Sequence, residues 1–150
     1  MLAIGLVVVL AAAVVLAWRL IWADSHGETV TDAGEVAGAW EPISVLGEEL
    51  DAGRYTANVT LQSHGDTWAF VAEGGCNGHR GYLDIDPSGQ VNARVLGLDG
   101  PEMNCHGGDP QFPNLTALLA ASRIQLTDDG ALYLYDGDDM LASYDLIRDP

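Results

Sequence analysis

Two cysteines, each close to a histidine, are the residues of this chain best suited to bind a metal or act as nucleophiles. Cys76 and His79 form a Cys-x-x-His pair, and Cys105 stands directly before His106. Two sulfur and two nitrogen ligands are a set that tetrahedral zinc accepts. Neighbouring residues such as Cys105 and His106 do not easily bind one ion together, because structural zinc sites separate their ligands along the chain. The spacing therefore leaves zinc as an alternative and does not predict it.

A cysteine nucleophile with a histidine base would need a lowered thiol pKa. The chain has 22 Asp and Glu against 6 Lys and Arg, a formal net charge of −16, and all of its cations are arginines. Such a negative field opposes thiolate formation, and it also repels phosphate backbones. The sequence has no Ser-His-Asp order and no phosphate-binding loop. We therefore expect no catalytic residues, no cofactor and no nucleic-acid partner.

Two acidic segments have the composition of calcium loops. Residues 84–89 (Asp-Ile-Asp-Pro-Ser-Gly) place oxygen ligands at loop positions 1, 3 and 5 and a glycine at position 6. Position 12 would be Val95, where a calcium loop needs a bidentate Glu. The acidic residues of 136–139 lie between two predicted strands, where Asp-Gly is turn chemistry. Both segments are therefore predicted to be hairpin turns, and no metal site is expected.

Alternating β-formers separated by Gly, Asp and Pro predict a succession of short strands. One helix is expected over Pro110 to Ser122, because Phe112, Leu115, Leu118 and Leu119 recur at helical spacing. The predicted strands are Tyr55 to Leu61, Thr67 to Ala72, Tyr82 to Ile85, Val91 to Leu96, Arg123 to Thr127, Ala131 to Tyr135 and Met140 to Leu146.

Many short strands around one helix predict an α+β fold with a mainly antiparallel sheet. Because sheet edges must be covered, we expect this sheet to be curved and barrel-like, with the helix packed against it. The chain has 150 residues, enough for one ordinary domain.

The N-terminal segment 1–23 is predicted to be a transmembrane signal anchor that precedes this domain. Leu2 to Ala23 contains Arg19 as its only charge, and as a helix it would span about 33 Å, close to the thickness of a bilayer core. A cleaved signal peptide is the alternative, which would leave a secreted protein. Arg19 is too little evidence to set the orientation of the anchor by charge.

Residues 24–38 are acidic, small and aperiodic, so we expect a flexible tether. Ordered structure is then predicted to begin near Trp40, with the domain covering residues 39–150.

The domain carries motifs in a recognisable order. Gly75-Cys76-Asn77 is followed after three residues by Gly81, and Met103-x-Cys105 stands before the predicted helix. This arrangement resembles the META domain, the HslJ-like family of bacterial envelope proteins, over roughly Trp40 to Tyr144. The resemblance implies a curved α+β domain outside the cytoplasmic membrane, often linked to stress response, with no established chemistry.

In that exported setting, a disulfide between Cys76 and Cys105 is the favoured interpretation of the two cysteines. It would stabilise the fold by about 3–4 kcal/mol on the chain-entropy model. Free or buried thiols are the alternative beside zinc. The expected function is a non-enzymatic binding module, anchored in the membrane with its domain on the extracytoplasmic side and bound to an envelope protein or cell-wall component. A small-ligand domain that uses the mouth of the curved sheet as its pocket is the other candidate.

Overall fold

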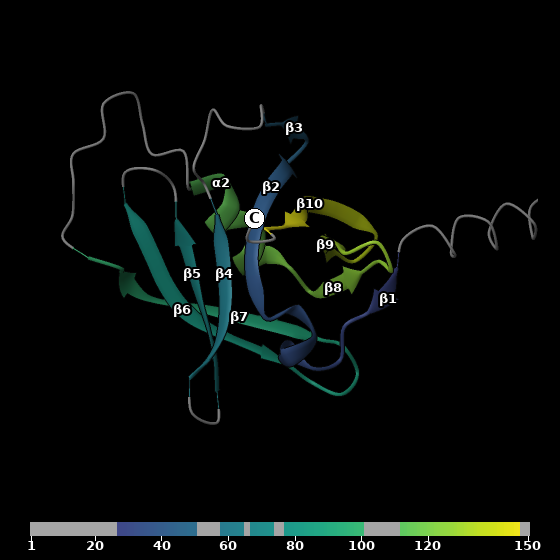
Figure 1. The fold of residues 1–150 in the computed structure, drawn as a ribbon, viewed down its shortest axis with the longest axis horizontal. Helices are drawn as coiled ribbons and strands as arrows, with labels where there is room; N and C mark the ends of the chain where they lie inside the picture. The colour runs from purple at the N-terminus through teal and green to yellow at the C-terminus, as the bar shows by residue number, and fades with distance from the viewer. Residues whose placement is uncertain (1–26, 51–57, 65–66, 74–76, 101–111, 148–150) are drawn as a thin grey trace, which may run out of the picture.

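The computed structural model describes residues 27–50, 58–64, 67–73, 77–100 and 112–147 (Figure 1). Most of them lie in strands. In chain order the elements are β1 (Glu28–Thr29), the 3-10 helix η1 (Ala33–Val36), β2 (Gly38–Val45), β3 (Glu48–Glu49), β4 (Val59–His64), β5 (Thr67–Glu73), β6 (Gly78–Ile85), β7 (Val91–Leu98), α2 (Phe112–Ala120), β8 (Arg123–Leu126), β9 (Ala131–Asp136) and β10 (Asp139–Leu146).

These strands form one antiparallel sheet in the order β1-β8-β9-β10-β2-β4-β5-β6-β7, and β3 pairs with β2 beside this path. The sheet curves around a common interior, with α2 packed against it (Figure 1). The ends of the sheet approach each other where the amide of Val91 in β7 donates to the carbonyl oxygen of Ser122, 3.0 Å away, just before β8. The prediction of a curved antiparallel sheet with one helix is therefore confirmed.

The interior is filled by aliphatic and aromatic side chains from every large strand and from α2. Phe70 lies at its β5 side, Ile124 and Leu134 at its β8–β9 side, and Tyr144 on β10, and all four side chains are almost completely buried. Burial on alternate residues, as in Val59 and Leu61 of β4, follows from the period of two in a strand.

The helix buries a slightly different face from the one that the sequence predicts. Leu115 and Leu118 are buried as expected, whereas Leu119 is 42% exposed. Asn114 and Ala117 take its place in the interior. The buried set therefore follows the spacing of three and four residues, but it is rotated toward smaller and more polar side chains.

The tether prediction is wrong for residues 27–38. Residues 27–37, here called the N-terminal strap, comprise β1 and η1 and are built into the fold. β1 pairs with β8, the amide of Val30 donates to the carbonyl oxygen of Ile124, and Val30 and Val36 are buried. The described structure therefore includes β1 and η1, upstream of the Trp40 region where the sequence predicts ordered structure to begin.

The strap is held by local hydrogen bonds as well as by burial. The Asp32 carboxylate accepts from the amide of Gly34 at 2.6 Å, and the Glu35 carboxylate accepts from the amide of Asp32 at 2.9 Å. This reciprocal pair is a capping box that starts η1. An acidic segment that appears too polar to fold is ordered because its carboxylates cap backbone donors while its few apolar residues turn inward.

No helix within the described ranges is long and apolar enough to cross a membrane. The predicted anchor, residues 1–23, lies outside those ranges.

Candidate functional site

Gly81 is the member of the predicted motif with the most restrictive surroundings. It lies on the inner face of β6, opposite Phe70 of β5 and Val95 of β7. A Cβ atom at this position would overlap the carbonyl oxygen of Arg94 and the ring of Phe70. Only glycine lets β7 and the aromatic ring approach so closely. The motif glycine therefore has a packing role in the curved sheet.

The register between β6 and β7 shifts directly beside this glycine. Arg80 is opposite Gly97 and Gly81 is opposite Val95, which leaves Leu96 without a partner on β6. Such a bulge bends and twists the strand that carries the extra residue. Gly81 and the bulge together let the two strands curve at this point.

Of the other motif residues, Asn77 is described and half-buried, just before β6. Gly75, Cys76, Met103 and Cys105 lie outside the described residues, and so does the predicted disulfide.

The described residues that flank the two cysteines come together. The amide of Asp99, directly after β7, donates to the carbonyl oxygen of Gly78, at the start of β6, over 2.7 Å. Of the alternative zinc ligands, only His79 lies within the described ranges, on β6. In those ranges no three His, Cys, Asp or Glu side chains converge as a metal site requires.

Residues 84–89 form the predicted hairpin turn. The Asp86 Oδ1 atom accepts from the Ser88 amide at 2.8 Å, from the Ser88 hydroxyl at 2.6 Å and from the Gln90 amide at 3.0 Å. These hydrogen bonds lower the pKa of Asp86 below its usual 3.8, and the bond from the Ser88 hydroxyl makes the largest contribution. The carboxylate at position 3 of the calcium-like pattern thus closes the turn by accepting these hydrogen bonds.

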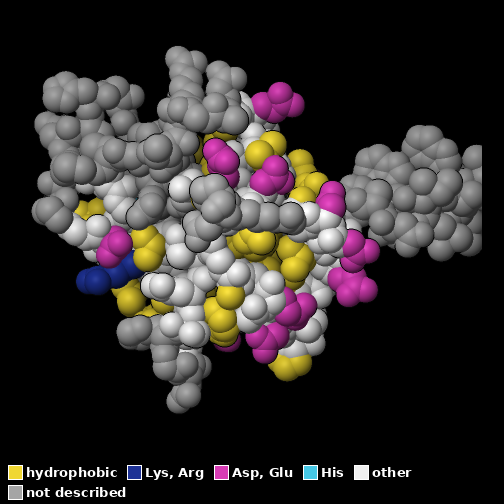
Figure 2. Space-filling view, in the orientation of Figure 1, with side chains coloured by type: hydrophobic (Ala, Val, Ile, Leu, Met, Phe, Trp, Pro, Cys, Tyr) yellow, Lys and Arg dark blue, Asp and Glu magenta, His cyan; other side chains and the backbone are white. Residues whose placement is uncertain are grey.

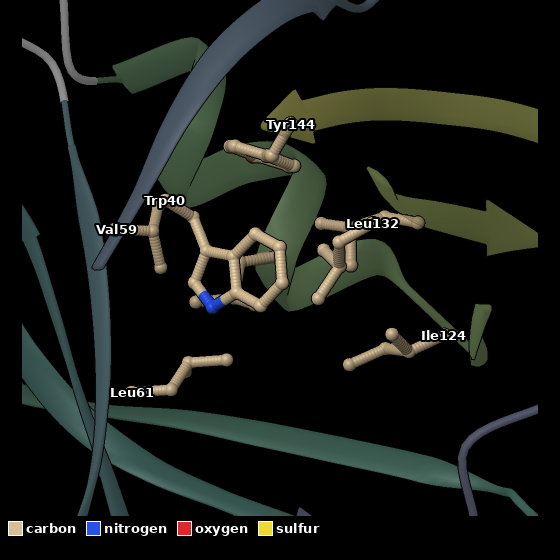
Figure 3. A pocket seen from close by; sticks show the side chains of 8 residues that line it. Trp40, Val59, Leu61, Ile124, Leu132 and Tyr144 are labelled. Carbon is tan, nitrogen blue, oxygen red and sulfur yellow. The ribbon is translucent and has the colours of Figure 1, made fainter. Parts of the chain in front are cut away.

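The mouth of the sheet is the predicted position of a ligand pocket, and the described residues line one small cavity in its interior. This cavity has a volume of about 10 Å³, it is partly open, and apolar side chains surround it (Figure 3). It is lined by Trp40, Val59, Leu61, Leu118, Ile124, Leu132, Leu134 and Tyr144. The indole of Trp40 projects from β2 toward Leu132 and Ile124 of the opposite strands (Figure 3). The volume is about that of one water molecule, and the polar partners that would hold a water are missing from its lining.

The two polar atoms nearest this cavity are already hydrogen-bonded. The Trp40 indole N–H donates to the carbonyl oxygen of Val36 in the strap, over 2.9 Å. The Tyr144 hydroxyl donates to the amide oxygen of Asn114 in α2. Burial raises the pKa of Tyr144 far above its usual value of 10.0, so the phenol stays neutral. These groups hold the strap and the helix to the sheet and are not available to a ligand.

A second aromatic contact lies on the outer face of the sheet. The Arg123 guanidinium stands 4.9 Å from the centre of the Tyr135 ring, and its Nη2 atom donates to the carbonyl oxygen of Gly137 at 3.2 Å. Burial raises the pKa of Tyr135, and the charge of Arg123 partly opposes that rise. Arg123 is thereby used to fasten the β9–β10 turn to β8.

Charge is unevenly distributed over the described surface. Acidic side chains gather on the right-hand part of the face in Figure 2, and arginine lies at the opposite edge. Arg80 and Arg94 are exposed on β6 and β7. Exposed acids accompany these arginines at Asp84, Asp86 and Asp99. The exposed acids of the remaining described elements are Glu28, Asp32, Glu35, Glu48, Glu49, Asp128, Asp129, Asp136, Asp138, Asp139 and Asp145.

No family model, curated protein or solved structure matches this chain. The site must therefore be interpreted from its own geometry.

Sequence reasoning missed a group of exposed aliphatic side chains beside the β2–β3 turn. Ile43, Leu46 and Met140 are 41%, 46% and 50% exposed. Ile43 and Leu46 fall in a segment for which no element was predicted. Gly47 is the one residue of this segment that could have indicated a turn there.

Proposed function

We propose that this chain is a membrane-anchored, extracytoplasmic, META-like domain that acts as a non-enzymatic interaction module for an envelope protein or cell-wall component. The packed interior carries this proposal. The cavity that the described residues line in the interior, of about 10 Å³ and with an apolar lining, is too small for a small-molecule ligand. Binding is therefore assigned to the outer surface, and the small-ligand alternative is not pursued.

The family assignment is supported by the order of the motifs and by the setting of Gly81. Gly81 occupies the glycine position of the META-like pattern, and a Cβ atom there would overlap the Arg94 carbonyl oxygen and the Phe70 ring. A motif glycine that sterics require supports the family assignment more strongly than the same residue at an exposed position would.

A disulfide between Cys76 and Cys105 is part of the proposal, and chain length permits it. Cys76 is two residues from Gly78, Cys105 is six from Asp99, and Gly78 and Asp99 are hydrogen-bonded. Six residues can span about 20 Å, whereas the two α-carbons of a disulfide must lie within about 7 Å. The bond would close the chain between β6 and the segment before α2.

The position of the strap adds a spatial consequence to the proposed anchor. The anchor ends at Ala23 and the strap begins at Gly27. The intervening chain can bridge at most about 14 Å. The domain would therefore be held close to the bilayer, with β1 and β8 as its nearest part, rather than displayed on a long tether.

One experiment on full-length protein tests anchor, compartment and disulfide together. Cells expressing the chain are fractionated, and the protein is labelled with a maleimide under denaturing, non-reducing conditions and weighed by mass spectrometry. We expect intact mass in the membrane fraction and no labelled thiol. The Cys105→Ser variant is the control and should label once, at Cys76.

Two labelled thiols in the wild-type protein would refute the disulfide and the oxidising compartment. A mass lacking the first 23 residues would replace the anchor by a cleaved signal peptide.

A further inference from the structure

Leu46 has a backbone conformation that its side chain disfavours. It occupies the β2–β3 turn with φ of 51°, and Gly47 follows with φ of 83°. Two successive residues with positive φ are typical of the tight hairpin turn in which Asn-Gly or Asp-Gly is preferred. A leucine in this left-handed region is strained, because its Cβ crowds the backbone.

Burial does not compensate for that strain. The Leu46 side chain is 46% exposed, and it is absent from the core cluster that surrounds Phe70 and Tyr144. Backbone strain at a residue whose side chain is not buried within the fold indicates that this side chain contacts another molecule.

Two further residues with exposed aliphatic side chains, Ile43 and Met140, lie on the backbone segments that adjoin Leu46. The Leu46 amide donates to the carbonyl oxygen of Leu141 at 2.7 Å, which places Leu46 next to Met140 at the start of β10. Ile43 lies on the same hairpin, where a register shift leaves it without a partner on β10. Ile43, Leu46 and Met140 are together called the hairpin patch.

Acidic residues adjoin the hairpin patch. Glu48 and Glu49 form β3, paired with Val45 and Ser44 of the same hairpin, and Asp139 precedes Met140. All three acids are exposed. Figure 2 shows hydrophobic side chains among acidic ones in the upper part of the molecule, where β2 ends.

We propose that the hairpin patch docks into an apolar groove of a protein partner whose rim carries Lys or Arg. This inference rests on the proposed interaction function and deepens it by naming the surface. Charge complementarity selects the partner: the acids beside the patch favour a basic rim. A second copy of this chain would place carboxylates opposite carboxylates and be repelled, because the net charge is −16 and the sequence has no lysine. An anionic lipid surface would be repelled in the same way.

The test uses the full chain, labelled with ¹⁵N in neutral detergent micelles, and two synthetic peptides of equal length and charge. The first alternates Leu and Lys, and the second has Ser in place of Leu. We expect the Leu-Lys peptide to shift amide signals of residues 43–50 and 138–142, and the Ser-Lys peptide to bind at least tenfold more weakly.

Leu46→Asn supplies the decisive variant, because Asn accepts the left-handed turn and the hairpin should stay folded. We expect at least tenfold weaker binding of the Leu-Lys peptide, with a melting temperature equal to or about 2–4 °C above that of the wild type. Leu96→Asn, at the exposed bulge of β7, is the matched control and should bind like the wild type.

Equal binding of both peptides, shifts spread over all acidic segments, or unchanged affinity in Leu46→Asn would each overturn the hairpin patch as the docking surface. These outcomes are separate from the fractionation and thiol results. A membrane-bound, disulfide-linked protein with diffuse peptide shifts would retain the proposed function and lose only this inference.

Discussion

The Tyr144 hydroxyl donates a hydrogen bond to the amide oxygen of Asn114 at 3.2 Å, and both side chains are buried. Asn114 is the one polar or charged side chain in the buried set of the described residues. The bond joins α2 to β10, and it orients the helix that covers the interior.

Removing either partner of this bond should destabilise the fold. Asn114→Ala leaves the Tyr144 hydroxyl buried without its acceptor, which costs about 1–3 kcal/mol of unfolding free energy. Tyr144→Phe should cost a similar or smaller amount. Urea unfolding of both variants and of the double variant checks the coupling. If the double variant lost the full sum of the single effects, the two side chains would not interact.

Gly81→Ala should be among the most damaging small substitutions in this chain. The added methyl group would overlap the Arg94 carbonyl oxygen and the Phe70 ring, so we expect a loss of about 3 kcal/mol in urea unfolding. Gly78→Ala is the matched control on the same strand, since its Cβ would lie 3.3 Å from the Asp99 Cβ, a contact that a small shift relieves. Equal stability of the two variants would contradict the proposed close approach at Gly81.

The Asp86 turn should respond to acid in a defined direction. The folded pKa of Asp86 lies below its ordinary 3.8, so its hydrogen bonds stabilise the turn above that pH. The contribution is lost as the pH falls through the lowered pKa. An NMR titration of the carboxyl carbon measures this value. Ser88→Ala should raise the pKa toward 3.8, because the hydroxyl is the largest cause of the shift. An unchanged pKa in that variant would exclude this cause.

Weakening the strap should lower the stability of the whole sheet. Val36 is completely buried, and the Val36 carbonyl oxygen accepts from the Trp40 indole. Val36→Ala retains that carbonyl and removes two methyl groups, so we expect a loss of about 2 kcal/mol of unfolding free energy. Exposed Glu35→Ala, which removes the capping carboxylate, should cost about 1 kcal/mol. If Val36→Ala left stability unchanged in thermal and urea unfolding, the strap would not be a structural part of the domain.

The strands and the helix that the sequence predicted share one property: their signal is local. Residues 67–73 and 131–136 carry β-forming residues between turn residues, and apolar residues of 112–120 recur at helical spacing. Each pattern is sufficient to identify its element, because side-chain direction within an element follows backbone geometry alone.

Two parts of the fold, β2 and the strap, were not predicted from the sequence because their local pattern is weak. β2 contains Pro42, which argues against a strand in the middle of a sheet. Pro42 is accommodated beside the register shift at Ile43, where the pairing with β10 is irregular. The strap is acidic and short in apolar residues, and only the Asp32–Glu35 capping box marked it as structured.

From the sequence alone came the acidic composition, the curved antiparallel sheet with one helix, and the turn at Asp86. The tertiary structure decided which residues close the sheet, through Val91 and Ser122, and it selected Asn114 over Leu119 for the interior. It also left Leu46 strained and exposed. The physical reason is that these choices depend on pairing between segments far apart in the chain, and the periodicity of one segment holds no information about its distant neighbour.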